Sequence, residues 1–258
     1  MDIKAYLRRI GFQGETTGPE PVESLRQLQF AHLCTVPFEN LSIHAGEPIL
    51  VEPAALFDKI VRRRRGGFCY EANGLFAALL RALGFQVTLL SAEVANGEGV
   101  FGPPFDHMAL LVELEERWLV DVGFGDAFLW PLRLDERGAQ VQGRRAYRLL
   151  PDGDELILQQ RDQQREAPEA DWRPQYRFRL RAYDYPDYAA MCHYHQTSPD
   201  SHFTQHRVCS RATSDGGRLT LRDDRLIITA PDGTKTERTV RDEGVYTAVL
   251  QQQFGIVL

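Results

Sequence analysis

The chain has 258 residues, of which 43% are hydrophobic and 26% are charged, proportions that are typical of a globular protein and exclude wholesale disorder. Its 36 acidic and 30 basic residues give a net charge of −6, so we expect no general attraction to nucleic acid or to an anionic membrane. The longest apolar stretch, residues 74–85, is interrupted by Arg81 and falls short of the ~20 residues that a membrane span requires.

The residues from Met1 to Lys4 include an acid and no apolar run, so no secretory signal is predicted. The cysteines contain no Cys-x-x-Cys pair and are too few for a disulfide framework. They are Cys34, Cys69, Cys192 and Cys209. We therefore expect a cytoplasmic protein whose thiols stay reduced.

The first third of the chain predicts helices, because apolar residues recur there at every third or fourth position. The expected helices cover residues 3–10, 21–33, 53–61 and 70–83. Pro21 suits the start of the second helix, and Gly84 suits the end of the fourth.

After Gly84 the pattern changes to short alternating runs separated by turn residues, which predicts strands. The expected strands are 86–94, 107–114, 117–122, 147–150, 156–159 and 176–182. Residues 151–154, Pro-Asp-Gly-Asp, are typical of a hairpin turn. Six short strands in a row favour an antiparallel sheet or barrel.

The last quarter of the chain mixes both kinds of element. Strands are expected at 218–222, 225–229 and 234–240, and a terminal helix at 242–254. Residues 186–211 fit one helix followed by a loop, but their pattern leaves the assignment open. The order of helices, then strands, then a mixed tail predicts an α+β fold and not alternating βαβ units.

Cys69 is the strongest candidate for chemistry. Gly66 and Gly67 allow a sharp backbone turn before it, and it falls in the first turn of the predicted helix 70–83. The N–H groups and the positive dipole end at that place favour a negatively charged sulfur. We therefore expect a lowered pKa for Cys69 and a thiol that attacks acyl groups, although a cysteine without such a setting is more typical of a hydrophobic core.

A thiol nucleophile needs a base and a group that orients the base, and two adjacent strands offer His107 and Asp121. If Glu113 lies opposite Arg117, these two residues share one face and are diagonal neighbours about 7–8 Å apart at Cα, within hydrogen-bonding reach. A shift by one residue would separate them onto opposite faces. We favour the first register because it pairs opposite charges and places the apolar residues together on the other face.

Three segments of this sequence closely resemble the signature segments of the arylamine N-acetyltransferases. They are Arg-Gly-Gly-Phe-Cys-Tyr-Glu-Ala-Asn at 65–73, Asp-His-Met-Ala-Leu-Leu-Val at 106–112 and Leu-Val-Asp-Val-Gly-Phe-Gly at 119–125. The likeness extends to residues 36–41 and 197–203 and so covers most of the chain. It implies a helical bundle at 1–85, an antiparallel β-barrel at 86–185 and an α/β lid at 186–258, with a Cys-His-Asp core like that of thiol proteases and transglutaminases.

The resemblance also implies an activity. This is ping-pong transfer of acetyl from acetyl-CoA, through an acetyl-cysteine, to an arylamine, arylhydrazine or arylhydroxylamine. The catalytic positions of the family fall on Cys69, His107 and Asp121. Positions that line the acceptor site fall on Phe38, Phe124 and Phe203, and coenzyme A contacts are expected at Val94, Gly102, Pro103 and Gly125.

Three rival interpretations stay open from the sequence. The chain could be an amide synthase that uses another acyl donor, an enzyme of the transglutaminase or thiol-protease type, or a binding protein without turnover. The preferred acceptor and the oligomeric state are left open as well.

Two further clusters are weaker signals. The four arginines at 62–65 could bind phosphates, but they are more typical of a solvated helix end with one arginine turned inward toward a buried acid. Cys192, His193 and His195, even with His202 and His206, match no standard zinc spacing, so no metal is expected.

Overall fold

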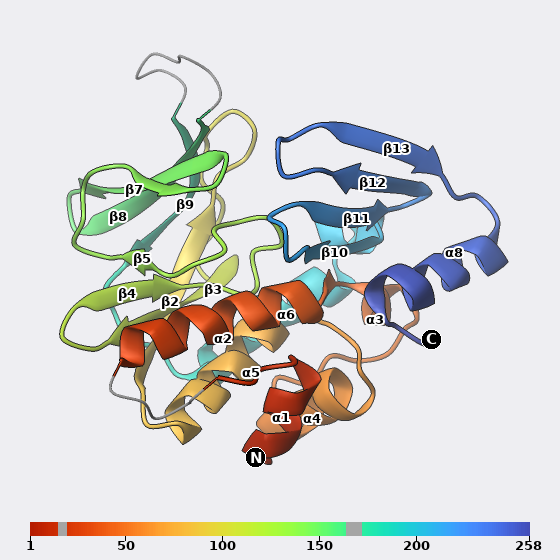
Figure 1. Ribbon diagram of the computed structural model, residues 1–258, viewed down its shortest axis with the longest axis horizontal. Coiled ribbons are helices and arrows are strands. Elements are labelled where there is room, and N and C mark those ends of the chain that lie inside the picture. Colours follow the sequence, from red (N-terminus) through yellow and green to blue (C-terminus); the bar gives the residue numbers. More distant parts are fainter. Residues whose placement is uncertain (15–19, 164–171) are drawn as a thin grey trace.

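The computed structural model describes residues 1–14, 20–163 and 172–258. Figure 1 shows the N-terminal helices together on one side, a large sheet above them, and a second, smaller sheet formed mainly by the C-terminal part of the chain. Among the described residues, no helix is long and apolar enough to cross a membrane.

The predicted N-terminal helices are confirmed, and their starts follow ordinary helix chemistry. Asp2 accepts a hydrogen bond from the backbone N–H of Ala5 at 2.9 Å, and prolines occupy the first helical positions at Pro21 and Pro53. The helices are α1 (Ile3–Arg9), α2 (Pro21–Thr35), α3 (Leu41–His44), α4 (Pro53–Phe57), which continues as a π-helical segment (Asp58–Arg62), and α5 (Cys69–Ala82).

The large sheet is the predicted barrel. Over residues 86–163 and 172–179 it has eight antiparallel strands in the order β5-β4-β3-β2-β9-β8-β7-β6. They are β2 (Gln86–Val94), β3 (His107–Glu113), β4 (Arg117–Val120), β5 (Leu132–Arg133), β6 (Gln140–Gln142), β7 (Arg145–Asp152), β8 (Glu155–Asp162) and β9 (Arg173–Arg179). The Gln140 amide joins the two end strands: its Nε2 donates to the Arg133 carbonyl at 3.0 Å and its Oε1 accepts from the Arg133 N–H at 2.8 Å. The barrel is thereby nearly closed.

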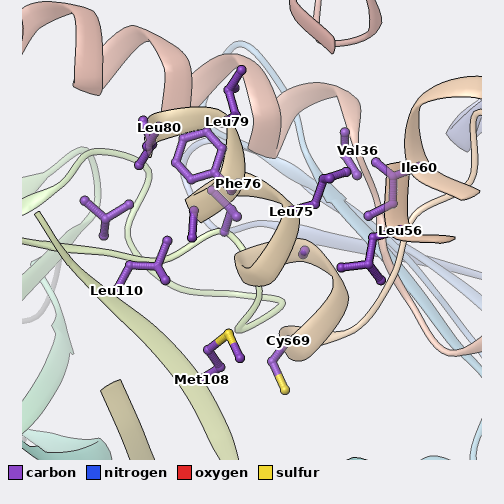
Figure 2. Close-up of a cluster of buried hydrophobic side chains, with 14 of the residues drawn as sticks. Val36, Leu56, Ile60, Cys69, Leu75, Phe76, Leu79, Leu80, Met108 and Leu110 are labelled. Atoms are coloured by element: carbon purple, nitrogen blue, oxygen red, sulfur yellow. The ribbon is translucent and has the colours of Figure 1, made fainter. Parts of the chain in front are cut away.

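The hairpin of β3 and β4 adopts the favoured register, with Glu113 opposite Arg117 and Leu111 opposite Leu119. The side chains on its two faces belong to two separate hydrophobic cores. The face with Met108 and Leu110 packs on α5, as Figure 2 shows, with Cys69 at the edge of the same cluster. The other face, with Leu111 and Leu119, lies inside the barrel.

Several strand predictions need correction. The strand expected at 117–122 ends at Val120, so Asp121 lies just beyond it, and the strand expected at 176–182 runs from Arg173 to Arg179. The short strands β5 and β6 were not predicted. Two or three residues are too few to show an alternating pattern, so only pairing with a neighbour identifies such strands.

The second sheet has five strands within the described part of the chain, in the order β1-β10-β11-β12-β13. They are β1 (Phe38–Glu39), β10 (Val208–Ala212), β11 (Arg218–Arg222), β12 (Arg225–Thr229) and β13 (Lys235–Thr239). The expected terminal helix is confirmed as α8 (Glu243–Val249) with a π-helical end (Leu250–Phe254). β1 pairs Phe38 with Ser210, so the N-terminal third contributes one strand to the C-terminal sheet.

Residues 186–211, which the sequence left open, contain more than a helix and a loop. A 3-10 turn (Tyr185–Tyr188) leads into α6 (Ala189–Thr197), which is followed by α7 (His202–Gln205) and the start of β10. Through this segment the chain returns past the N-terminus of α5, because the Tyr185 hydroxyl donates to the Tyr70 carbonyl at 2.6 Å.

Candidate active site

A pocket of about 740 Å³ lies where the helices, the barrel and the C-terminal region meet. Cys69 and His107 both line it, and Asp121 lies behind His107. All three side chains are buried, with exposed fractions of 3% or less. The structure therefore brings the predicted nucleophile, base and acid together.

Cys69 is the first residue of α5, and the glycines before it are needed for that placement. A Cβ on Gly66 would lie 1.9 Å from the Pro37 carbonyl oxygen, and one on Gly67 would lie 2.6 Å from the Cβ of Glu71. Only glycine leaves room for these two approaches. The Glu71 carboxylate then accepts a hydrogen bond from the Phe68 N–H at 3.2 Å, which caps the helix.

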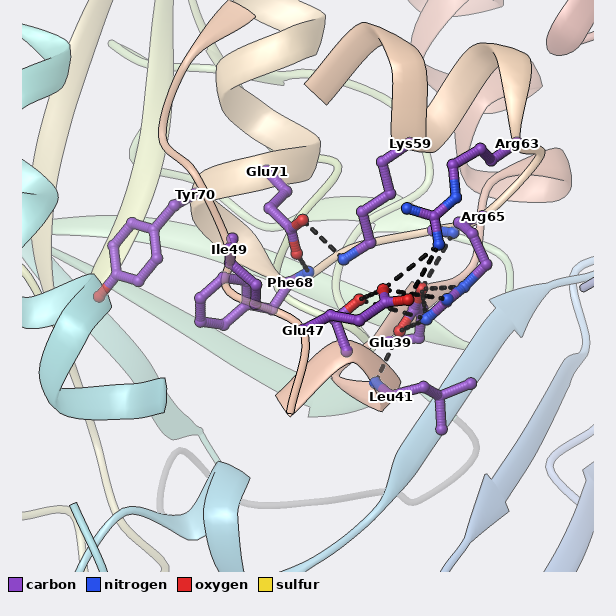
Figure 3. Close-up of polar contacts among 12 residues, drawn as sticks. Glu39, Leu41, Glu47, Ile49, Lys59, Arg63, Arg65, Phe68, Tyr70 and Glu71 are labelled. Carbon is purple, nitrogen blue, oxygen red and sulfur yellow. Dashed lines mark hydrogen bonds and ion pairs between the residues drawn. The ribbon is translucent and has the colours of Figure 1, made fainter. Parts of the chain in front are cut away.

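A buried ion-pair network supports the turn before Cys69 (Figure 3). Glu71 accepts from Lys59 Nζ at 2.7 Å, and Glu39 accepts from Arg65 Nε at 3.0 Å. Arg65 is 2% exposed, whereas Arg62 and Arg63 are exposed. The prediction that one arginine of the run turns inward to meet a buried acid is confirmed.

His107 and Asp121 form the predicted hydrogen bond, with Nε2 of His107 2.8 Å from Oδ2 of Asp121. This contact leaves Nδ1 as the ring nitrogen that can serve the thiol. The Cys69 sulfur accepts a hydrogen bond from the backbone of Met108, the residue next to His107. The sulfur is therefore held beside the strand start that carries the imidazole.

Sequence reasoning missed two residues that hold Asp121. Its Oδ1 accepts from Asn73 Nδ2 at 2.9 Å, and its Oδ2 accepts from the Tyr176 hydroxyl at 3.1 Å. Asn73 follows Cys69 by one helical turn and so lies on the same face of α5, a spacing that could have identified it. Tyr176 comes from β9, and no local pattern connects it with Asp121.

The expected lowering of the Cys69 pKa is wrong. Complete burial raises the pKa of Cys69 well above that of an ordinary thiol, because a thiolate there would lose its hydration. The hydrogen bond from the Met108 backbone favours the thiolate but is the smaller effect, and the nearby Asp106 carboxylate opposes ionisation further. A base is therefore required for the sulfur to react.

The pocket has an aromatic wall. Phe38, Phe124 and Phe203, which the sequence assigned to the acceptor site, all line it. The ring centroids of Phe38 and Phe203 lie 6.1 Å apart, and Phe124 meets the His107 ring edge-on at 5.1 Å. A flat apolar ring placed among them would therefore reach the imidazole.

The residues expected to contact coenzyme A divide between two places. Val94 and Gly102 line the pocket, whereas Pro103 is not among its lining residues. Gly125 lines an adjoining cleft of about 340 Å³, which shares Phe38 and Phe124 with the pocket.

That cleft carries basic side chains that the sequence analysis missed. They are Arg144, Arg145, Arg218, Arg222 and Lys235. Arg145 and Arg218 both pair with Asp126, whereas Arg222 and Lys235 are exposed on β11 and β13. These residues lie far apart in sequence, so only the pairing of strands brings them together.

No metal site emerges from residues 1–14, 20–163 and 172–258, where no group of three or more His, Cys, Asp or Glu side chains could hold an ion. The clustered Cys192 and His195 instead meet different partners: Gln196 contacts Cys192, and Asp106 contacts His195.

Comparisons with known proteins agree with this geometry. A family model described as N-acetyltransferase matches residues 21–258. The chain is 36% identical over 256 residues to the arylamine N-acetyltransferase of Escherichia coli (strain K12), covering 98% of this chain and 88% of that protein. The chain belongs to the arylamine N-acetyltransferase family. It is accordingly an N-acetyltransferase, as the resemblance of its signature segments predicted.

Solved structures of the family show the same fold. The arylamine N-acetyltransferase from Salmonella typhimurium matches with a TM-score of 0.89 at 35% identity, over 98% of this chain and 90% of that one. The Mycobacterium marinum arylamine N-acetyltransferase in complex with CoA matches with a TM-score of 0.87 at 32% identity, over 99% and 93% of the two chains. The predicted α+β fold class of the family is therefore confirmed.

Proposed function

We propose that this chain transfers acetyl from acetyl-CoA to the nitrogen of arylamines, arylhydrazines or arylhydroxylamines by a ping-pong mechanism through acetyl-Cys69. One observation carries the proposal: the Cys69 sulfur accepts a hydrogen bond from the backbone of Met108, the residue next to His107, and Nε2 of His107 lies 2.8 Å from Oδ2 of Asp121. This nucleophile and base face a pocket with an aromatic wall, which suits an aromatic acceptor.

In the first half-reaction the Cys69 sulfur attacks the thioester carbonyl of acetyl-CoA while its proton moves to Nδ1 of His107. Burial raises the pKa of Cys69, so the proton must leave during the attack and not before it. The carbon–sulfur bond to coenzyme A then breaks, and the departing thiolate takes the proton from the imidazolium. Asp121 stabilises the imidazolium meanwhile, and the backbone N–H of Cys69 at the start of α5 can donate to the oxyanion.

In the second half-reaction the acceptor nitrogen attacks the acetyl carbonyl and gives up one proton to His107. The bond from the carbonyl carbon to the Cys69 sulfur breaks, and the sulfur receives that proton. Because one thioester replaces another in the first step, the acetyl group stays activated until the amine arrives. The products are the N-acetylated acceptor and the free thiol.

The basic cleft fits the charged end of coenzyme A. It adjoins the pocket through Phe38 and Phe124, and its exposed Arg222 and Lys235 could contact phosphates. Val94 and Gly102 line the pocket that also contains Cys69, and Gly125 lines the cleft. We keep these three residues and Pro103 as proposed contacts of coenzyme A. The relative from Mycobacterium marinum has been solved with CoA, which supports this choice of donor.

Intact mass measurement after mixing the protein with acetyl-CoA alone tests the proposal. We expect one added acetyl group, one equivalent of free coenzyme A, and peptide mapping that places the acetyl group on Cys69. Cys69→Ala should remove the adduct. Cys34→Ala should keep it, and this variant is the matched control because Cys34 is the most accessible of the four thiols.

A protein that returns acetyl-CoA unchanged would contradict the proposal, as would an acetyl group that disappears in Cys34→Ala. If acetyl-Cys69 forms, addition of an arylamine should release it as the acetylated amine. We also propose a cytoplasmic location, on the sequence grounds given above.

A further inference from the structure

The acceptor pocket contains a carboxylate that the proposed mechanism does not use. Among the described residues that line the pocket, Asp106 is the only Asp, Glu, Lys or Arg. Its side chain is 20% exposed, so it is shielded from bulk water yet accessible from the pocket. It directly precedes His107 in the chain, which places it next to the reacting groups.

The backbone around Asp106 is held rigidly. The Tyr70 hydroxyl donates to the Phe105 carbonyl at 2.7 Å, and the Phe105 N–H donates to Ser91 Oγ at 2.8 Å. Phe105 has a φ of 66°, a left-handed conformation that a bulky residue adopts only when its surroundings enforce it. The carboxylate is thus presented from a fixed turn and not from a loose loop.

The two oxygens of Asp106 have different surroundings. Oδ1 lies 3.1 Å from Nε2 of His195, a buried side chain of α6 that also lines the pocket. The contact has an ion-pair distance but lacks the alignment of a hydrogen bond. Oδ2 lies against Gly102, where a Cβ would come within 2.9 Å of it. His195 is held in turn by a 3.1 Å contact between its Nδ1 and Ser201 Oγ.

We propose that Asp106 determines the acceptor specificity of this pocket, selecting aromatic amines that carry a cationic, N–H-rich substituent such as an amidinium over those that carry a carboxylate. The inference rests on the proposed function and names the substrate class of the same site. An amidinium can donate two parallel hydrogen bonds to a carboxylate, whereas Asp106 repels a second carboxylate in the same pocket. His195 positions the Asp106 carboxylate toward the pocket.

The distribution of charge supports this assignment. The pocket that contains Asp106 has no arginine or lysine among its described lining residues, whereas the adjoining cleft has five. The phosphates of the donor are therefore accommodated in the cleft, and the negative charge in the pocket acts on the acceptor.

Three acceptors of similar shape test the proposal: 4-aminobenzamidine, neutral 4-aminobenzamide and 4-aminobenzoate. The quantity to measure is kcat/KM for each acceptor, which in a ping-pong reaction reports the second half-reaction. In the wild-type protein we expect the order amidine, amide, acid. In Asp106→Asn we expect the ratio of amidine to acid to fall by about tenfold or more, the loss typical of a hydrogen bond to a charged group.

Two further variants make the test decisive. Asp106→Ser is shorter and cannot press on Gly102, so it should show the same loss even if asparagine fits badly. Glu98→Gln removes an equal charge from the loop beside the pocket without being one of its lining residues, and its ratio should stay within about twofold of wild type, because solvent screens so exposed a charge.

The outcomes separate the two proposals. The amount of coenzyme A released when acetyl-CoA is mixed with the protein in the absence of acceptor equals the amount of acetyl-Cys69 formed. If the wild-type protein releases none, the proposed function fails. If it releases one equivalent but the ratio is unchanged in both Asp106 variants, or falls equally in Glu98→Gln, the specificity proposal is overturned and the proposed function stands.

Discussion

The side-chain amide of Asn73 donates a hydrogen bond to Asp121 at 2.9 Å and so ties the helix that begins with Cys69 to the carboxylate that lies 2.8 Å from the His107 ring. Asn73 Nδ2 also donates a hydrogen bond to the Met108 carbonyl at 2.6 Å, and Asn73 Oδ1 accepts one from the Val122 N–H at 2.8 Å. One buried side chain thus sets the position of α5 relative to β3 and to the residues that directly follow β4.

Asn73→Ala should therefore impair both catalysis and folding. It leaves buried partners unsatisfied, and we expect a loss of about 3 kcal/mol in the free energy of unfolding. The rate of acetyl-Cys69 formation should fall by about tenfold to a hundredfold, because Asp121 and α5 lose their common anchor. Urea unfolding and stopped-flow release of coenzyme A measure the two effects.

Asn40→Ala is the matched control. Asn40 is also buried and makes three hydrogen bonds, to the carbonyls of Phe203 and His206 and from the Val208 N–H, at 2.7–2.8 Å. Its loss should lower stability similarly but raise the KM for the acceptor, since Phe203 lines the pocket. Equal losses in acetyl-Cys69 formation for the two variants would contradict the special role of Asn73.

Gly123→Ala should damage the site for a steric reason. Its Cβ would lie 2.7 Å from Nδ2 of Asn73, and 2.8 Å from the Cα of Cys69. Backbone cannot yield as a flexible side chain can, so we expect a loss of about 1–3 kcal/mol in stability and a marked fall in kcat. Gly97→Ala is the control. Gly97 lines the same pocket, but a Cβ there would have no atom within 4 Å, so this variant should leave both stability and kcat unchanged. Similar behaviour of the two alanines would refute the steric argument.

Arg65→Met should destabilise the turn before Cys69. It leaves the carboxylate of Glu39, which is fully buried, without its charged partner, a change that costs about 3–5 kcal/mol. The double variant Glu39→Gln with Arg65→Met should recover part of that loss, because no unpaired charge remains. Asp154→Asn is the control, because it breaks an exposed ion pair: Asp154 is 78% exposed and its partner Arg179 is 53% exposed. This variant should change the free energy of unfolding by less than about 1 kcal/mol. Chemical denaturation of the wild-type protein and the three variants gives the free energies of unfolding to be compared.

His32 should make the free energy of unfolding depend on pH, and one substitution can separate its contribution from those of other groups. Burial lowers the pKa of His32 to about 3, and its Nδ1 lies 2.8 Å from the Tyr6 hydroxyl. Between about pH 3 and 6.5 the unfolded chain binds a proton at this residue that the folded protein does not, so stability falls as the pH falls through this range. From pH 7 to pH 5 this residue alone should remove about 2 kcal/mol.

The variant His32→Gln keeps an acceptor for the Tyr6 hydroxyl but does not titrate. Its free energy of unfolding should therefore fall less steeply between pH 7 and pH 5 than that of the wild-type protein. Identical slopes for the two proteins would show that His32 is protonated equally in the folded and unfolded states.

Much of the barrel could be read from the sequence, because its long strands alternate and its turns carry distinctive residues. The Asp152–Glu155 pair closes the turn expected at 151–154, and the charge pairing of Glu113 with Arg117 indicated the correct register. β1 and β10 escaped detection. Phe38 and Glu39 form a strand only because Ser210 and Cys209 lie beside them, and no local pattern reports a partner some 170 residues away. The division into parts at residues 85 and 185 stays a prediction.

The sequence alone indicated the family, the candidate nucleophile Cys69 with its candidate base and acid, and the helix start at which the thiol lies, because these depend on contiguous motifs and on the period of a helix or strand. Tertiary packing alone decided how strongly Cys69 holds its proton, since desolvation is set by everything that surrounds the sulfur and outweighs the helix start. Packing also brought Asp106 to His195 and gathered the basic residues of the cleft. The charge of a pocket depends on which side chains line it. These side chains come from segments far apart in the sequence, so the charge is set only when the chain folds.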